Sequence, residues 1–149
     1  MHKVNIILTE STLSITKFNS ITSQLYVEVG TVSFPSKGWF DLSGSVLSMW
    51  LLSLNSYIQN NDHEATLYFM DGDYSMKLEC LKKNQSLLRL IDSNNEVFVG
   101  IIDMFHFGNQ LLTAVDKVIR HFGEQSNLKI VHELMDLSSA LSLSLHNMD

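Results

Sequence analysis

The sequence predicts an α+β fold, with one or two antiparallel β-sheets of about seven strands, a central helix after the third strand and two helices at the C-terminal end. Two observations predict it. Apolar and polar residues alternate over 4–32 and again over 66–102, whereas apolar residues recur every three or four positions over 42–58 and 111–145. The chain has 149 residues with neither a repeat nor a linker-like stretch, so we expect a single domain, 1–149.

The first β region is expected to be a meander. Its alternating runs lie at 4–8, 13–18 and 25–32. Short polar stretches separate them, which is typical of consecutive antiparallel strands. Pro35 ends the third strand because it has no N–H to donate to a neighbouring strand, and Gly38 allows the following loop a left-handed backbone.

The central helix is expected over 42–58. Asp41 or Ser43 can cap its start by accepting hydrogen bonds from the free N–H groups of the first turn. Its apolar residues form a broad stripe, which favours packing against a sheet. The stripe consists of Val46, Leu47, Trp50, Leu51, Leu54, Tyr57 and Ile58.

The second β region contains a clear hairpin. The runs 66–70 and 74–80 flank Asp71-Gly72-Asp73, which indicates a tight turn because glycine accepts a positive φ. Further strands are expected at 87–91 and 97–102. The last run is apolar on both faces, which is typical of a strand in the centre of a sheet.

Two helices are expected after the strands. The first covers 111–122 and ends at Gly123, and the second runs from a cap at Ser126 to about Leu145. The segment Met104-Phe105-His106-Phe107 precedes them. It is either an apolar wedge that seats the next helix or an exposed apolar patch.

Charge restricts the kinds of partner that this chain can bind. The formal net charge is −6, and Lys82-Lys83 is the only adjacent pair of basic residues. Binding to nucleic acid is therefore not expected, because phosphate contacts require clustered Lys and Arg. An acidic surface can instead steer a basic protein toward the chain.

The sequence favours a soluble protein of the cytoplasm. Cys80 is the only cysteine and lies in a strand-like run, so it is expected to pack there in a reducing compartment. The first residues, Met1 to Val4, lead into a strand pattern and not into a secretion signal. The most apolar window, 46–54, is too short to cross a bilayer, so no membrane contact is expected.

The sequence carries no recognisable motif for catalysis or metal binding. The six histidines form neither HxH nor HExxH, and the segment 71–73 lacks the further oxygen ligands of a calcium loop. The glycine-rich loops that bind nucleotides are absent, as is G-x-S-x-G. We therefore expect no metal, no cofactor and no catalytic residue, and hence a protein that is not an enzyme.

The two tryptophans have different expected roles. Trp50 lies on the apolar stripe of the central helix and is expected in the core. Trp39 lies in a loop beside Gly38 and Phe40, where a buried anchor and an exposed contact residue are both open interpretations.

Three short motifs carry a resemblance to a known group of proteins. They are Phe34-Pro35-x-x-Gly38-Trp39-x-Asp41, Leu47-x-x-Trp50 and Phe69-Met70-Asp71-Gly72-x-Tyr74. The pattern resembles small uncharacterised bacterial proteins, some of which look like immunity proteins, which protect a cell by binding a toxin. It covers half of the chain at most, and Met49 and Asp73 replace a tryptophan and a proline of the pattern. Residues of these kinds shape loops, caps and turns, so the resemblance implies a shared fold more than a shared partner.

The leading hypothesis is a non-enzymatic protein that binds another protein, such as a basic toxin domain, as the resemblance to immunity proteins implies. The residues expected at its contact surface are Trp39, Asp41, Asp71 and Asp73. Two alternatives stay open. One is a small-molecule binder or an enzyme whose site forms only in three dimensions, and the other is a structural protein that self-associates.

Overall fold

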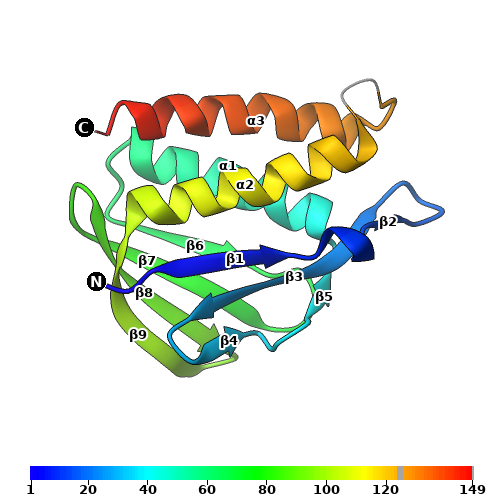
Figure 1. The fold of residues 1–149 in the computed structure, drawn as a ribbon. Coiled ribbons are helices and arrows are strands. Elements are labelled where there is room, and N and C mark those ends of the chain that lie inside the picture. Colours follow the sequence, from blue (N-terminus) through cyan, green and yellow to red (C-terminus); the bar gives the residue numbers. More distant parts are fainter. Residues whose placement is uncertain (124–125, 149) are drawn as a thin grey trace.

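The computed structural model describes residues 1–123 and 126–148 and has the predicted α+β architecture. Two antiparallel sheets lie on one side of the molecule and the helices on the other, with α3 above α1 and α2 (Figure 1). The helices in the described residues are η1 (Glu10–Thr12, a 3-10 turn), α1 (Ser43–Gln59), α2 (Met104–Phe122) and α3 (Lys129–His146). The described residues form nine strands where about seven are expected, and α1 follows the fifth instead of the third.

The first sheet is built around one long strand. Its members are β1 (Val4–Leu8), β2 (Ser14–Ile15), β3 (Ile21–Val29), β4 (Val32–Phe34) and β5 (Phe40–Asp41). Each of the other four pairs with β3, and all four pairs are antiparallel.

The predicted meander is wrong in two respects. First, β1 pairs directly with β3, with Val4 opposite Val29, and the second predicted strand shrinks to two residues after the 3-10 turn. Second, the predicted strand at 25–32 is two strands, because the chain reverses at Gly30, whose φ is +58°. A positive φ suits glycine, and the reversal lets β4 return along β3.

The second sheet contains the predicted hairpin. Its order is β6 (Glu64–Tyr68), β7 (Tyr74–Lys82), β8 (Gln85–Asp92) and β9 (Asn95–Asp103). In the hairpin, Leu67 lies opposite Met76, and Gly72 in the turn has the expected positive φ of +76°.

The strand β9 lies at the edge of this sheet, so its predicted central position is wrong. Within the described residues its only ladder partner is β8, and the other edge of β9 carries one isolated bridge, from Ile102 to His2. Ile102 is fully buried, whereas Val97, Val99 and Ile101 are 40% to 45% exposed. Alternation of side chains therefore places one apolar row in the core and leaves the other in solvent.

The core lies between the sheets and the helices. Buried apolar side chains from both sheets and from α1, α2 and α3 form one cluster. The helix α1 follows its predicted extent closely, and the apolar stripe listed for it above is buried or packed against the core. It contacts β6 and β3 on one side and α3 on the other.

The two C-terminal helices differ from the prediction mainly at their starts. The helix α2 begins seven residues early, because Asp103 caps it by accepting a hydrogen bond from the His106 N–H at 3.0 Å, and it ends at Gly123 as expected. Its first turn is both a wedge and a patch, since Phe107 is buried and Phe105 is 43% exposed. The helix α3 has no side-chain cap, and Ser126 lies three residues before it.

Among the described residues, no helix is both long enough and apolar enough to cross a membrane.

Candidate functional site

Two segments meet around the carboxylate of Asp41. One is the connection from β4 to α1, and the other is the turn between β6 and β7. One of the carboxylate oxygens, Oδ1, accepts the Leu42 N–H at 2.7 Å. The other, Oδ2, accepts the Trp39 indole N–H at 3.1 Å and the backbone N–H groups of Met70 and Asp71 at 3.2 and 3.3 Å. Asp41 is only 5% exposed, so these bonds replace water around a buried carboxylate.

The prediction that Asp41 or Ser43 caps α1 is wrong. Leu42 occupies the N-cap position, and no side chain there accepts a hydrogen bond from the first turn of the helix. Asp41 ends the strand β5, and its oxygens bind the β6–β7 turn and the loop instead. The hydroxyl of Ser43 is buried and has no hydrogen-bond partner among the described residues.

Aromatic rings connect this junction to the core. Trp39 packs on Tyr74 with ring centroids 5.1 Å apart, and Tyr74 packs on Phe34 at 5.7 Å. Phe34 contacts Phe69 at 5.7 Å, and Phe69 contacts the fully buried Trp50 at 5.1 Å. Every pair is edge-to-face, the arrangement that the ring quadrupoles favour. Residues of the three short motifs, far apart in sequence, thus form one rigid frame.

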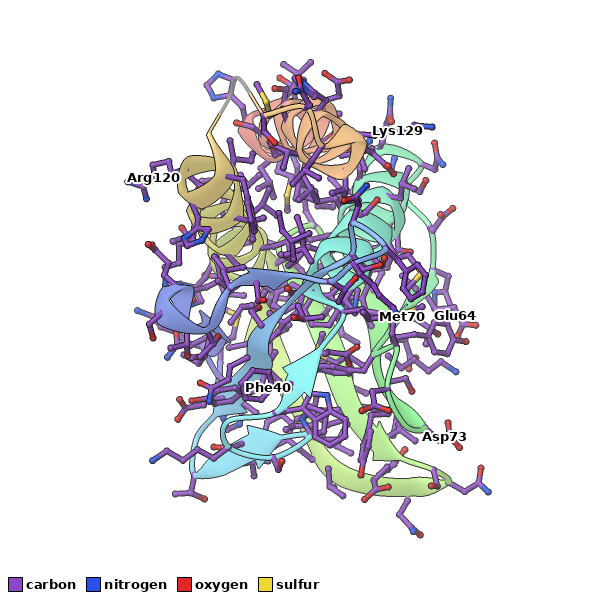
Figure 2. The ribbon with its side chains drawn as sticks, turned by 90° about the vertical axis from the view of Figure 1, so that its right-hand side faces the viewer. Phe40, Glu64, Met70, Asp73, Arg120 and Lys129 are labelled. Carbon is purple, nitrogen blue, oxygen red and sulfur yellow. The ribbon has the colours of Figure 1, made fainter. Side chains whose placement is uncertain are left out.

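We call the surface that this frame holds the corner surface, formed by Phe40, Met70, Asp71 and Asp73. Phe40 is 53% and Met70 is 48% exposed, and both aspartates are exposed. Between β5 and the β6–β7 turn lies a hollow of about 410 Å³. Its walls are Thr22, Phe40, Asp41, Leu42, Met70 and Asp71. Figure 2 looks onto this end of the molecule and labels Phe40, Met70 and Asp73.

The four residues predicted for the contact surface take three different positions. Asp71 and Asp73 are exposed on the turn, Trp39 is half-buried between the loop and Tyr74, and Asp41 lies beneath the surface with its carboxylate fully used. The structure therefore brings all four to one end of the molecule but leaves Asp41 with a structural role.

Sequence reasoning missed the two apolar members of the corner surface. Phe40 lies between Trp39 and Asp41 on a strand, so its side chain must point to the opposite face. That alternation is a signal that the sequence already contains. Met70 had no comparable signal, because its exposure depends on how the β6–β7 turn meets Asp41.

A second concavity, which we call the cleft, lies at the opposite end of α1. It has a volume of about 350 Å³, and its walls include Tyr57, Cys80, Lys82, Lys83 and Ser86. Tyr57 and Ser86 are both buried and share a hydrogen bond of 2.8 Å between their hydroxyl oxygens. Burial raises the pKa of Tyr57 above its ordinary value of 10.0, so the phenol holds its proton further into the alkaline range.

Neither concavity contains a cluster that suits a metal ion. Among the described residues, no group of three His, Cys, Asp or Glu side chains is close enough together to hold one.

Comparison of the chain with protein-family models, curated proteins and solved structures gave no match.

Proposed function

We propose that this chain binds another protein through the corner surface and acts in the cytoplasm as an immunity-like protein that neutralises a toxin without catalysing a reaction. The observation that carries the proposal is the pair Phe40 and Met70, two large apolar side chains that are half exposed on a rigid frame. They wall a hollow with Asp71 at its rim. The immunity-like role itself rests on the resemblance of the three motifs.

The corner surface has the composition of an interface core. Burying a Phe or Met side chain contributes about 1.5–3 kcal/mol, so covering Phe40 and Met70 supplies a sizeable part of a binding energy. The backbone beneath them is fixed by Asp41 and by the edge-to-face rings. A surface that is already ordered loses little conformational entropy when a partner binds.

Charge indicates the kind of partner. Asp71 and Asp73 are exposed at the corner surface, and Lys37 is the only basic residue in the segments 34–41 and 69–74. With a net charge of −6 the chain attracts a basic partner and repels an acidic one. Salt should therefore slow the association much more than it speeds the dissociation.

The test pairs this chain with a toxin domain encoded beside its gene, in cells that produce both. Phe40→Asp and Met70→Asp are expected to weaken the complex about thirtyfold or more and to abolish protection. Phe18→Asp is the matched control, because Phe18 is 78% exposed and lies outside the corner surface. Its binding and protection should equal those of the unchanged chain.

A second arm identifies the partner without using gene order. A photo-cross-linking amino acid at position 40 should capture one protein in the native cells, and the same group at position 18 should not. Protection that survives both corner substitutions would overturn the proposed surface. A gene neighbourhood without a toxin, together with no cross-linked protein at position 40, would overturn the immunity-like function.

A further inference from the structure

The cleft has a polar floor formed by two paired hydroxyl groups. Tyr57 and Ser86 are 5% and 1% exposed, and their two hydroxyl groups share one hydrogen bond. One of the two protons makes that bond, whichever group donates it. When Tyr57 donates that bond, the Ser86 proton is left to donate to a third group, and lone pairs also remain. Cys80, directly opposite Ser86 in the β7–β8 ladder, lies beside this floor.

Two positive charges lie at the rim of the cleft. Lys82 is the last residue of β7 and Lys83 follows it in the turn to β8, and both are exposed. Among the described residues, Asp62 is the one acidic residue in the cleft wall, so the charged side chains described there sum to +1. This is a local reversal of charge, because the whole chain carries −6.

The rest of the wall is half apolar, because Gln59, Asn61, Ser144 and Asn147 share it with four apolar side chains. The side chains of Ile58, Met104, Leu143 and Met148 line the cleft, and Leu143 is 63% exposed. A volume of about 350 Å³ lies within the range of small-molecule pockets and equals about a dozen water molecules of the liquid. An occupant therefore has room for an apolar body of moderate length.

We propose that the cleft binds a free amphipathic carboxylate, an acid with an apolar chain of about eight carbons. Its carboxylate accepts hydrogen bonds from the spare hydroxyl proton and from the Lys82 or Lys83 ammonium, and its chain covers the apolar wall. Charge complementarity selects the anion, and the apolar wall selects a chain over a small inorganic ion. This site lies at the far end of α1 from the corner surface and does not depend on the protein-binding function.

Cys80 makes the test direct, because it is the only cysteine, is exposed and lines the cleft. Its rate of reaction with iodoacetamide, a neutral reagent, reports whether the cleft is free. Octanoate at about ten times its Kd is expected to slow the reaction about tenfold, because only a small fraction of the clefts then remains empty. Octyltrimethylammonium and acetate are expected to leave the rate unchanged, since one has the wrong charge and the other has no chain.

Two double variants separate the local charge from the net charge. Lys82→Glu with Lys83→Glu should abolish the protection of Cys80 by octanoate. Lys17→Glu with Lys37→Glu makes the same change in net charge at exposed lysines outside the cleft and should retain it. Circular dichroism checks that each variant is folded at the octanoate concentration used.

Three results would overturn the proposal. The first is protection of Cys80 by octanoate that is no better than protection by the cationic surfactant, which would make the contact purely apolar. The second is a reaction rate that stays unchanged at 10 mM octanoate or more, about ten times a millimolar Kd. Equal loss of protection in the two double variants would show that net charge, and not the cleft, controls the reaction.

Discussion

Asp41 joins three segments of the chain through one carboxylate. It accepts N–H groups from Leu42, from the Trp39 indole and from the backbone of the β6–β7 turn. When a surface aspartate is lost, water can take over its hydrogen bonds at little cost, but Asp41 is only 5% exposed. Its loss leaves several donors unsatisfied away from solvent, and each such donor is expensive.

We expect Asp41→Asn to lower the free energy of unfolding by about 2–3 kcal/mol. The amide carries no charge, and its NH2 group places a hydrogen-bond donor where a carboxylate oxygen accepted N–H groups. Asp73→Asn removes the same charge from an exposed residue of the neighbouring turn and should change stability by less than about 0.5 kcal/mol. Urea unfolding followed by tryptophan fluorescence measures both. Equal effects of the two substitutions would contradict a structural role for Asp41.

Tyr57 should make stability depend on pH in the alkaline range. Burial, the largest cause, raises its pKa above 10.0, with smaller raising effects from Cys80 and Glu79 and an opposing effect from the hydrogen bond to Ser86. The folded state therefore holds its proton more tightly than the unfolded state. This stabilisation is fully present below pH 10 and is lost as the pH rises through the folded-state pKa.

Tyr57→Phe should accordingly flatten the fall in stability above pH 10 and, at neutral pH, cost about 1–3 kcal/mol because Ser86 loses its partner. Tyr68→Phe is the control, since Tyr68 is 59% exposed. Chemical unfolding at a series of pH values from 7 upward compares the three proteins, with pH 7 as the neutral reference. An alkaline slope that Tyr57→Phe leaves unchanged would show that other groups produce it.

At the level of single elements, the β6–β7 turn is fitted to the aromatic frame beside it. A Cβ atom added at Gly72 would lie 2.6 Å from the Cε2 atom of Tyr74. The Tyr74 ring cannot move away freely, because Trp39 and Phe34 pack against it. Gly30 also has a positive φ, but an added Cβ there meets nothing within 4 Å. Both turns thus require a left-handed backbone at glycine, but only at Gly72 would an added Cβ collide with a neighbouring side chain.

Both Gly30→Ala and Gly72→Ala should cost about 1–2 kcal/mol for the left-handed backbone. Gly72→Ala should cost about 1–3 kcal/mol more, because the Tyr74 ring must shift within a packed frame. Thermal unfolding gives the difference, and near-ultraviolet circular dichroism reports the altered rings of Tyr74 and Trp39. Equal costs and unchanged aromatic spectra would contradict the tight fit at Gly72.

Elements whose signal is local were predictable, and their arrangement was not. The stripe of α1, the β6–β7 hairpin and the end of α2 at Gly123 follow from residues a few positions apart. The pairing of β1 with β3 and the edge position of β9 depend on contacts between distant segments. The residues of β9 are apolar on both faces, as in a central strand, although one face is exposed. The sequence pattern alone therefore does not distinguish this edge strand from a central one.

On the scale of the whole molecule, α1 spans the distance between the two candidate sites. Its first residue follows the corner surface, and its last turn borders the cleft, so about 25 Å separates them. Figure 1 shows the two ends of α1 on opposite sides of the molecule. The corner residues Asp71 and Asp73 were predicted from the motifs, whereas the cleft was not, since it forms where β7, β8, α1 and α3 meet.

The two sheets are connected at both edges as well as through the helices. At one edge the His2 N–H donates to the Ile101 carbonyl at 2.8 Å, and at the other Asp41 of β5 binds the β6–β7 turn. Their apolar faces share one buried cluster with the helices. Neither sheet has a separate core that could keep it folded after the other is lost, which is the physical basis for cooperative unfolding.

We therefore expect all 149 residues to unfold in a single transition. Circular dichroism at 222 nm follows the helices, and fluorescence follows Trp39 at the corner and Trp50 in the core. The urea midpoints from the two signals should coincide, both in the unchanged chain and in Asp41→Asn, where both should move down together. Separated midpoints, or a fluorescence change that precedes the loss of helix, would show that the corner opens independently of the shared core.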